Sequence, residues 1–193
     1  MDTALMEEIR RYFQILATLH TTRADRGESG VCFALLTRTL QERLDDHLDR
    51  IFRLLGLRYP ARDIYNAFAA TNSRDRSIRA NAVEFLDNIL AKELKKVLIP
   101  IVEELPPEEV LQQANGVLDL PFTNRKEALQ SLLERNDPWL RACTLYEIGR
   151  CGLVDDFRHV MHTAAQDQNA VVRETAEFVL KKFAPPTREA KDR

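Results

Sequence analysis

The chain has 193 residues, of which 45% are hydrophobic and 30% are charged, and its formal net charge at pH 7 is -2. A chain of this length holds one continuous core or a short array of repeats, and only six glycines, four tyrosines and one tryptophan argue against a β-rich fold. The near-neutral charge excludes the overall field that steers proteins toward nucleic acid or anionic lipid, so we expect no nucleic-acid partner.

The sequence also indicates where in the cell the chain is expected. No apolar stretch approaches the ~20 residues that a membrane helix needs, and charged side chains among residues 1–20 exclude the apolar core of a signal peptide. The three cysteines, Cys32, Cys143 and Cys151, lack CxxC spacing and are typical of reduced thiols. We therefore expect a cytoplasmic chain that does not insert into a membrane. One form of this expectation is a position at the inner face of the membrane, as part of a larger protein.

The first third of the chain predicts two long helices with a break between them. Residues 1–20 are expected to form an amphipathic helix, residues 21–30 a polar loop or hinge with two glycines, and residues from about 31 to 55 a longer helix that Gly56 stops. Apolar side chains at three- and four-residue steps mark the face that each helix should bury. These are Leu5, Ile9, Phe13, Leu16 and Leu19 in the first helix, and Phe33, Leu36, Leu40, Leu44, Leu48, Ile51 and Leu55 in the second.

The rest of the chain predicts shorter helices in four pairs. The ranges are 59–72 with 74–91, 92–105 with 106–118, 123–136 with 137–152, and 154–168 with 169–183. Prolines at first-turn positions (Pro60, Pro138) and aspartates at caps (Asp75, Asp137) mark where helices begin. Residues 184–193 are polar and contain prolines, which predicts a linker or a C-terminal tail.

An arginine recurs in the second helix of these pairs. Arg79, Arg141 and Arg173 align the runs SIRANAVEFL, WLRACTLYEI and VVRETAEFVL; the first interval is 62 positions, twice 31, and the second is 32. A degenerate copy without arginine falls near Val110, and Asp46 with Arg50 extends the pattern upstream. One hairpin has too little apolar surface to fold alone, so residues 31–183 predict a repeat domain of stacked antiparallel helical hairpins.

The run DPWLRACTLYEIG resembles a HEAT repeat of the kind found in phycobilin-lyase-like proteins, with matches at Asp137, Pro138, Arg141 and Gly149. Residues 31 to about 183 are also similar to the soluble HEAT-like region that follows the membrane bundle of bacterial ATP/ADP-translocase-like transporters. The resemblance implies an all-α HEAT-like α-solenoid that binds a protein or an adjacent domain, such as the transmembrane part of a nucleotide transporter, without catalysis and without a cofactor. Because the chain has no transport helices, the resemblance implies no nucleotide exchange by this chain.

Seven residues are candidates for a structural ladder between repeats. An acid and an arginine four positions apart could act as a catalytic acid with an electrostatic partner, but the recurrence favours an N-cap with an ion pair. The resemblance implies that such residues form a ladder between neighbouring HEAT repeats. The seven are Asp46, Arg50, Asp75, Arg79, Asp137, Arg141 and Arg173.

Other candidate sites have simpler interpretations. His159 and His162 lie on one predicted helix face and could share a metal with His47 or Cys151, but no third ligand stands at a recognisable spacing. An arginine-rich stretch could contact lipid headgroups or nucleotide phosphate, yet interleaved carboxylates favour self-pairing. Its arginines are Arg38, Arg43, Arg50, Arg53, Arg58 and Arg62, and its acids Glu42, Asp45, Asp46 and Asp49.

Neither a Gly-rich phosphate loop nor a GxSxG motif occurs, so we expect no enzyme of these kinds. Two alternatives stay open. One is an enzyme of the HEAT-like phycobilin-lyase type, and the other is a HEAT-like DNA-binding or DNA-glycosylase module, which the near-neutral charge disfavours.

Overall fold

A computed structural model describes residues 2–24, 33–115, 117–118 and 124–183. Within these ranges the regular elements are ten α-helices and one short 3-10 helix, together with an isolated backbone bridge between Asn115 and Leu118, which confirms the all-α class. No helix in the described ranges has an apolar stretch that could cross a bilayer. Cys32, residues 25–30 of the predicted loop and the predicted tail at 184–193 lie outside the described residues.

The chain packs as two compact units, which are described separately. The first holds residues 1–21 and 40–123, and the second holds residues 22–39 and 124–193. The boundary between the units falls inside the range 31–183, and the N-terminal helix is grouped with part of that range. Hydrophobic periodicity reveals which face of a helix is apolar, but not which other helix buries it.

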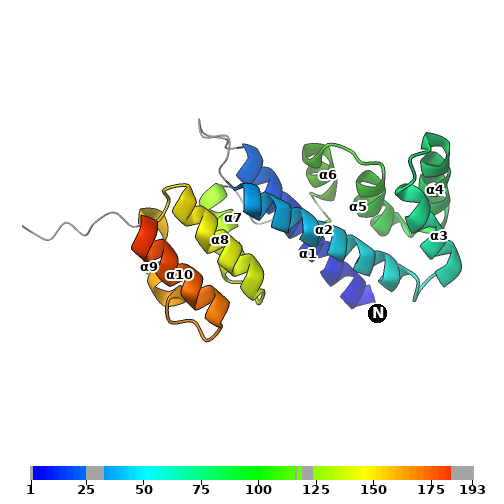
Figure 1. Cartoon of the computed structure of the whole chain (residues 1–193). Helices are drawn as coiled ribbons and strands as arrows, with labels where there is room; N and C mark the ends of the chain where they lie inside the picture. The colour runs from blue at the N-terminus through cyan, green and yellow to red at the C-terminus, as the bar shows by residue number, and fades with distance from the viewer. Residues whose placement is uncertain (1, 25–32, 116, 119–123, 184–193) are drawn as a thin grey trace, which may run out of the picture. The chain divides into compact units, whose positions relative to one another are not determined.

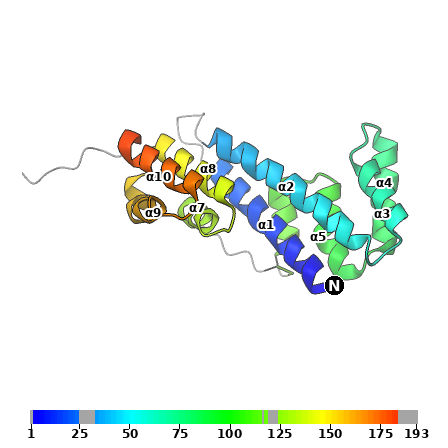
Figure 2. The same ribbon diagram turned by 60° about the horizontal axis from the view of Figure 1, so that its bottom comes forward.

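The first unit contains most of two long helices, α1 as far as residue 21 and α2 from residue 40, and these parts lie side by side in both views (Figures 1 and 2). α1 covers Asp2–Ala24 and therefore continues four residues into the predicted loop, and α2 covers Ala34–Leu55, ending just before Gly56 as predicted. Every side chain of the predicted apolar face of α1 is buried, as are those of α2 apart from the half-buried Leu48.

A buried polar pair lies between α1 and α2. His47 Nδ1 is 2.6 Å from Glu8 Oε1, and both side chains are only 9% exposed. Arg50 Nη1 lies 3.4 Å from the same carboxylate oxygen. Buried polar groups that find such partners fix how two helices pack, because leaving either group unpaired is costly.

Four shorter helices complete the first unit and form the first two predicted pairs (Figure 1). α3 packs against α4, α5 packs against α6, and α4 also contacts α5. Pro60 lies at the cap position of α3 rather than inside its first turn, and Pro107 is the first residue of α6. The bounds are Ala61–Thr71 for α3, Arg76–Ile89 for α4, Lys92–Val102 for α5 and Pro107–Ala114 for α6.

The second unit contains the last two predicted pairs. α7 packs against α8 and α9 against α10, while α8 and α10 lie side by side along much of their lengths (Figures 1 and 2). Gly149 permits this approach, since a Cβ atom there would lie 2.7 Å from Val179 Cγ1. The bounds are Arg125–Leu133 for α7, Pro138–Arg150 for α8, Asp155–Phe157 for the 3-10 helix, Arg158–Ala164 for α9 and Ala170–Phe183 for α10.

Glu147 of α8 fastens the start of α2 within the second unit. Its carboxylate, which is fully buried, accepts hydrogen bonds from the backbone N–H groups of Phe33 and Leu35, at 3.1 and 2.8 Å. Arg150 Nε lies 3.5 Å from the same carboxylate. The first N–H groups of a helix have no partner within the helix and need acceptors. The carboxylate of Glu147, 114 positions after Phe33, is the acceptor here.

Candidate interaction site

The helices that contain the recurrent arginines, α4, α8 and α10, begin with the same kind of cap. Asp75 accepts from Ser77 N at 2.8 Å before α4, and Asp137 accepts from Leu140 N at 3.0 Å before α8. Asn169 plays this role before α10, where it accepts from the N–H of Val171 at 3.0 Å. Each cap stands four residues before its arginine. The predicted caps at Asp75 and Asp137 are therefore confirmed, with Pro138 at the first turn of α8.

The arginines themselves bind two kinds of acceptor. Arg79 Nη1 donates to the carbonyl of Ser73 at 2.6 Å, and Arg173 Nη1 donates to the carbonyl of Asp167 at 2.9 Å. Both acceptors lie six residues earlier in the chain. Arg141 Nη2 instead donates to the Asp167 carboxylate at 2.5 Å, so this one arginine joins two successive helical pairs.

Asp167 is held in its charged form at this junction. The backbone N–H of Asn169 donates to the carboxylate at 2.9 Å, and this bond, followed by the bond from Arg141, lowers the pKa of Asp167 below its usual value. The Nε atom of Arg141 is buried and has no hydrogen-bond partner among the described residues.

Asp46 and Arg50 have a different setting from the other predicted ladder residues. They lie in the middle of α2, not at a helix start. Asp46 pairs with Arg43 at 3.3 Å, and Arg50 points to Glu8 of α1. The structure therefore brings Arg141 to a partner in the next pair, and it places Asp46 and Arg50 in contacts of the α1–α2 region.

The other sequence candidates have separate local settings among the described residues. Among the described residues, no group of three or more His, Cys, Asp or Glu side chains could hold a metal ion. His159 and His162 are both exposed on α9, while Cys143 is buried and accepts a hydrogen bond from Thr39 Oγ1 at 3.6 Å. In the arginine-rich stretch, Arg53 pairs with Asp49 at 2.8 Å, as self-pairing predicts.

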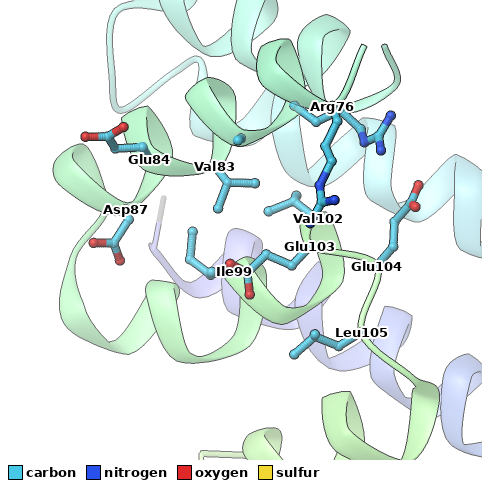
Figure 3. A pocket seen from close by; sticks show the side chains of 11 residues that line it. Arg76, Val83, Glu84, Asp87, Ile99, Val102, Glu103, Glu104 and Leu105 are labelled. Carbon is cyan, nitrogen blue, oxygen red and sulfur yellow. The ribbon is translucent and has the colours of Figure 1, made fainter. Parts of the chain in front are cut away.

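A groove between α4 and α5 in the first unit has a volume of about 760 Å³. Its apolar centre is formed by Val83 of α4 with Ile99 and Val102 of α5, which point toward one another in Figure 3. Ala80 and Leu105 extend this apolar surface. Val83 and Ile99 remain half-exposed, so the groove has apolar surface that a ligand can cover.

Charged side chains border the groove. The carboxylates of Glu84 and Asp87 lie on one side in Figure 3, and Arg76 and Glu104 lie on the opposite side, with Glu103 near the centre. Six charged residues line it in all: Arg76, Arg79, Glu84, Asp87, Glu103 and Glu104. Four carboxylates against two guanidinium groups give this lining a formal charge of -2.

The turn after α5 places one of these carboxylates in an unusual backbone conformation. Glu104 has a φ of 55°, in the left-handed region that favours glycine. Its N–H donates to Ile101 O at 3.1 Å, and the next N–H, that of Leu105, donates to Pro100 O at 3.2 Å. This is the usual double hydrogen bond at a helix C-terminus, with Glu104 where glycine is common.

Of the residues that line the groove, only Arg79 was a candidate from the sequence. A signal for the others is present in the helical period, because the α4 residues of the groove fall on one face at three- and four-residue steps. These are Arg76, Arg79, Ala80, Val83, Glu84 and Asp87. The α5 residues join the groove only because α5 packs beside α4, and hydrophobic periodicity does not predict that contact.

Comparisons with protein-family models, with curated proteins and with solved structures gave no match.

Proposed function

We propose that this chain is a non-catalytic helical-repeat module that binds another protein or an adjacent domain, with the groove between α4 and α5 as the contact site. The observation that carries the proposal is the groove itself, about 760 Å³ in volume, with half-exposed Val83 and Ile99 in its centre. Apolar surface that is rimmed by polar side chains is typical of places where proteins meet.

The repeat part of the proposal rests on local structure that recurs. Three helices share a polar cap four residues before an arginine, and two of these arginines bind a carbonyl six residues back. Together with the packing of α3 on α4, α5 on α6, α7 on α8 and α9 on α10, this recurrence supports a HEAT-like arrangement of hairpins. Stacking of the hairpins into an α-solenoid is part of the proposal.

The nature of the natural partner is a finer proposal, which rests on the resemblance alone. On that basis the partner is the transmembrane part of an ATP/ADP-translocase-like nucleotide transporter, and this chain regulates it from the cytoplasmic side. Co-purification of the chain with the membrane part is the direct test. Transport that is unchanged after removal of this region from the transporter would contradict the regulatory role.

The contact site can be tested without knowing the partner. A displayed random peptide library is selected on the full chain and on the double variant Val83→Gln with Ile99→Gln, which makes the groove polar without changing its charge. The matched control, Leu57→Gln with Ile78→Gln, alters two exposed apolar residues outside the groove. We expect binders that are retained by the wild type and the control and lost on the groove variant. Binders that all ignore the groove variant would overturn the proposal.

A further inference from the structure

We infer that the α4–α5 groove takes a basic amphipathic helix, a segment with one apolar face flanked by lysine or arginine. This inference rests on the proposed function and adds the chemistry of the ligand. Two properties of the groove carry it, namely the apolar centre and the excess of carboxylates around that centre.

The apolar centre sets the first requirement. Val83, Ile99 and Val102 come from two helices and face one another across the groove (Figure 3). A helix that lies in such a groove presents apolar side chains at three- and four-residue steps, so that they cover the exposed parts of Val83 and Ile99. Covering apolar surface makes the favourable contribution to binding.

The carboxylates set the second requirement. Glu84, Asp87 and Glu103 are all exposed and border the apolar centre, and Glu104 extends the acidic border on the far side. Lys95 lies 3.5 Å from Asp87 and offsets part of this charge. An acidic peptide would be repelled by Glu84, Asp87 and Glu103, whereas lysine or arginine beside the apolar face of the peptide would be attracted to them.

The two arginines give the groove a direction. Arg79 is anchored to the carbonyl of Ser73, and Arg76 stands on the same side of the groove as Glu104, away from Glu84 and Asp87. The basic residues of the ligand therefore belong near Glu84 and Asp87. An acidic residue or the helix C-terminus of the ligand belongs near Arg76.

The test uses the full chain and two probe peptides of 14 residues, one of leucine and lysine and the other of leucine and glutamate, in the same helical pattern. Fluorescence anisotropy measures their affinities. We expect the lysine peptide to bind about tenfold more tightly than the glutamate peptide, because several exposed carboxylates each attract lysine weakly and repel glutamate weakly. Its affinity should fall as sodium chloride is raised, because exposed charges are screened by salt.

Charge variants locate the effect. The triple variant Glu84→Gln, Asp87→Asn and Glu103→Gln should weaken the lysine peptide about tenfold. The matched triple Asp63→Asn, Glu93→Gln and Glu109→Gln removes three exposed carboxylates outside the groove and should leave its affinity unchanged. All six positions are exposed, so the variants keep the core intact and are checked by their circular dichroism.

The outcomes separate this inference from the proposed function. If both peptides bind equally and lose affinity on the polar groove variant, the groove is a binding site without charge preference, and the basic ligand is excluded. If the lysine peptide binds but neither the charge triple nor the groove variant weakens it, the peptide binds elsewhere and the inference is overturned. The proposed function itself fails only when the library selection yields no groove-dependent binder.

Discussion

Arg141 of α8 donates through Nη2 to the carboxylate of Asp167, which lies in the segment between α9 and α10. Asp167 also accepts from the arginine of the next helix, because Arg173 donates to its backbone carbonyl. One residue thus receives hydrogen bonds from the arginines of two successive helical pairs. This is the kind of contact that couples neighbours in a repeat array.

A double-mutant cycle measures this coupling. Arg141→Ala, Asp167→Ala and the double variant are compared by urea unfolding. The Arg141 and Asp167 side chains are 24% and 18% exposed, so we expect a coupling energy of about 1 kcal/mol. Effects that simply add would show that the pair contributes nothing to stability.

The same carboxylate predicts a pH dependence. Because the pKa of Asp167 is lower in the folded chain than the usual value of 3.8, its stabilisation is complete above that value. The stabilisation is lost as the pH falls below about 3.8, through the folded pKa. Asp167→Asn removes this titration but keeps an oxygen for the N–H of Asn169. The stability difference between wild type and variant, measured by urea unfolding, should therefore shrink between pH 6 and pH 3; a constant difference would contradict the assignment.

Glu147→Gln should destabilise the second unit by about 1–3 kcal/mol. An amide has one acceptor oxygen, so one of the two N–H groups of Phe33 and Leu35 would face a donor inside a buried site. Thermal unfolding measures the loss, and faster amide hydrogen exchange at Leu35 locates it. Glu174→Gln, an exposed change on α10, is the control and should leave both quantities unaltered.

Gly149→Ala should also destabilise the chain, although alanine is the better helix former by about 1 kcal/mol. The added methyl group would meet Val179 Cγ1 at 2.7 Å and Phe183 Cδ2 at 2.9 Å, and overpacking of this kind costs about 1–3 kcal/mol. In a Val179→Ala background, which removes the nearest clash, most of the penalty should disappear. An equal penalty in both backgrounds would exclude the close packing of α8 and α10 as its cause.

Glu104→Gly should stabilise the first unit by about 1 kcal/mol, because glycine adopts the left-handed conformation without a steric penalty. Gly152 holds the same position after α8, with a φ of 70° and no atom within 4 Å of an added Cβ. Gly152→Ala is therefore the mirror experiment and should cost about 1 kcal/mol. Chemical unfolding measures both. Shifts of the same sign would contradict the backbone explanation.

Local chemistry made much of the fold predictable. The cap at Asp137, the proline that follows it and the stop at Gly56 each act on a helix end within one or two turns of the residue, so each can be predicted from the sequence. Hydrophobic periodicity likewise marked the buried faces of α1 and α2. The sequence did not predict that the contacts would divide inside residues 31–183.

The candidate site was far less predictable. Val83 and Ile99 each fit an ordinary helix pattern, and only the contact between α4 and α5 turns them into the centre of a groove. Nothing in the sequence around Glu147 predicts a special role, yet its side chain is fully buried and accepts from the N–H of Phe33, 114 positions earlier, just before α2.

The sequence by itself therefore determined the helical class, the caps at Asp75 and Asp137, the stop at Gly56 and the recurrent cap with its arginine, since these depend on neighbours a few residues apart. Only the tertiary structure decided that Arg141 reaches Asp167, that Glu147 accepts from the N–H of Leu35 in α2, and that α4 and α5 form a groove with an apolar centre and an acidic border. The physical reason is that a side chain selects its partner by distance in space. Helix periodicity orients a side chain around its own axis, and it contains no information about which distant helix comes to meet it.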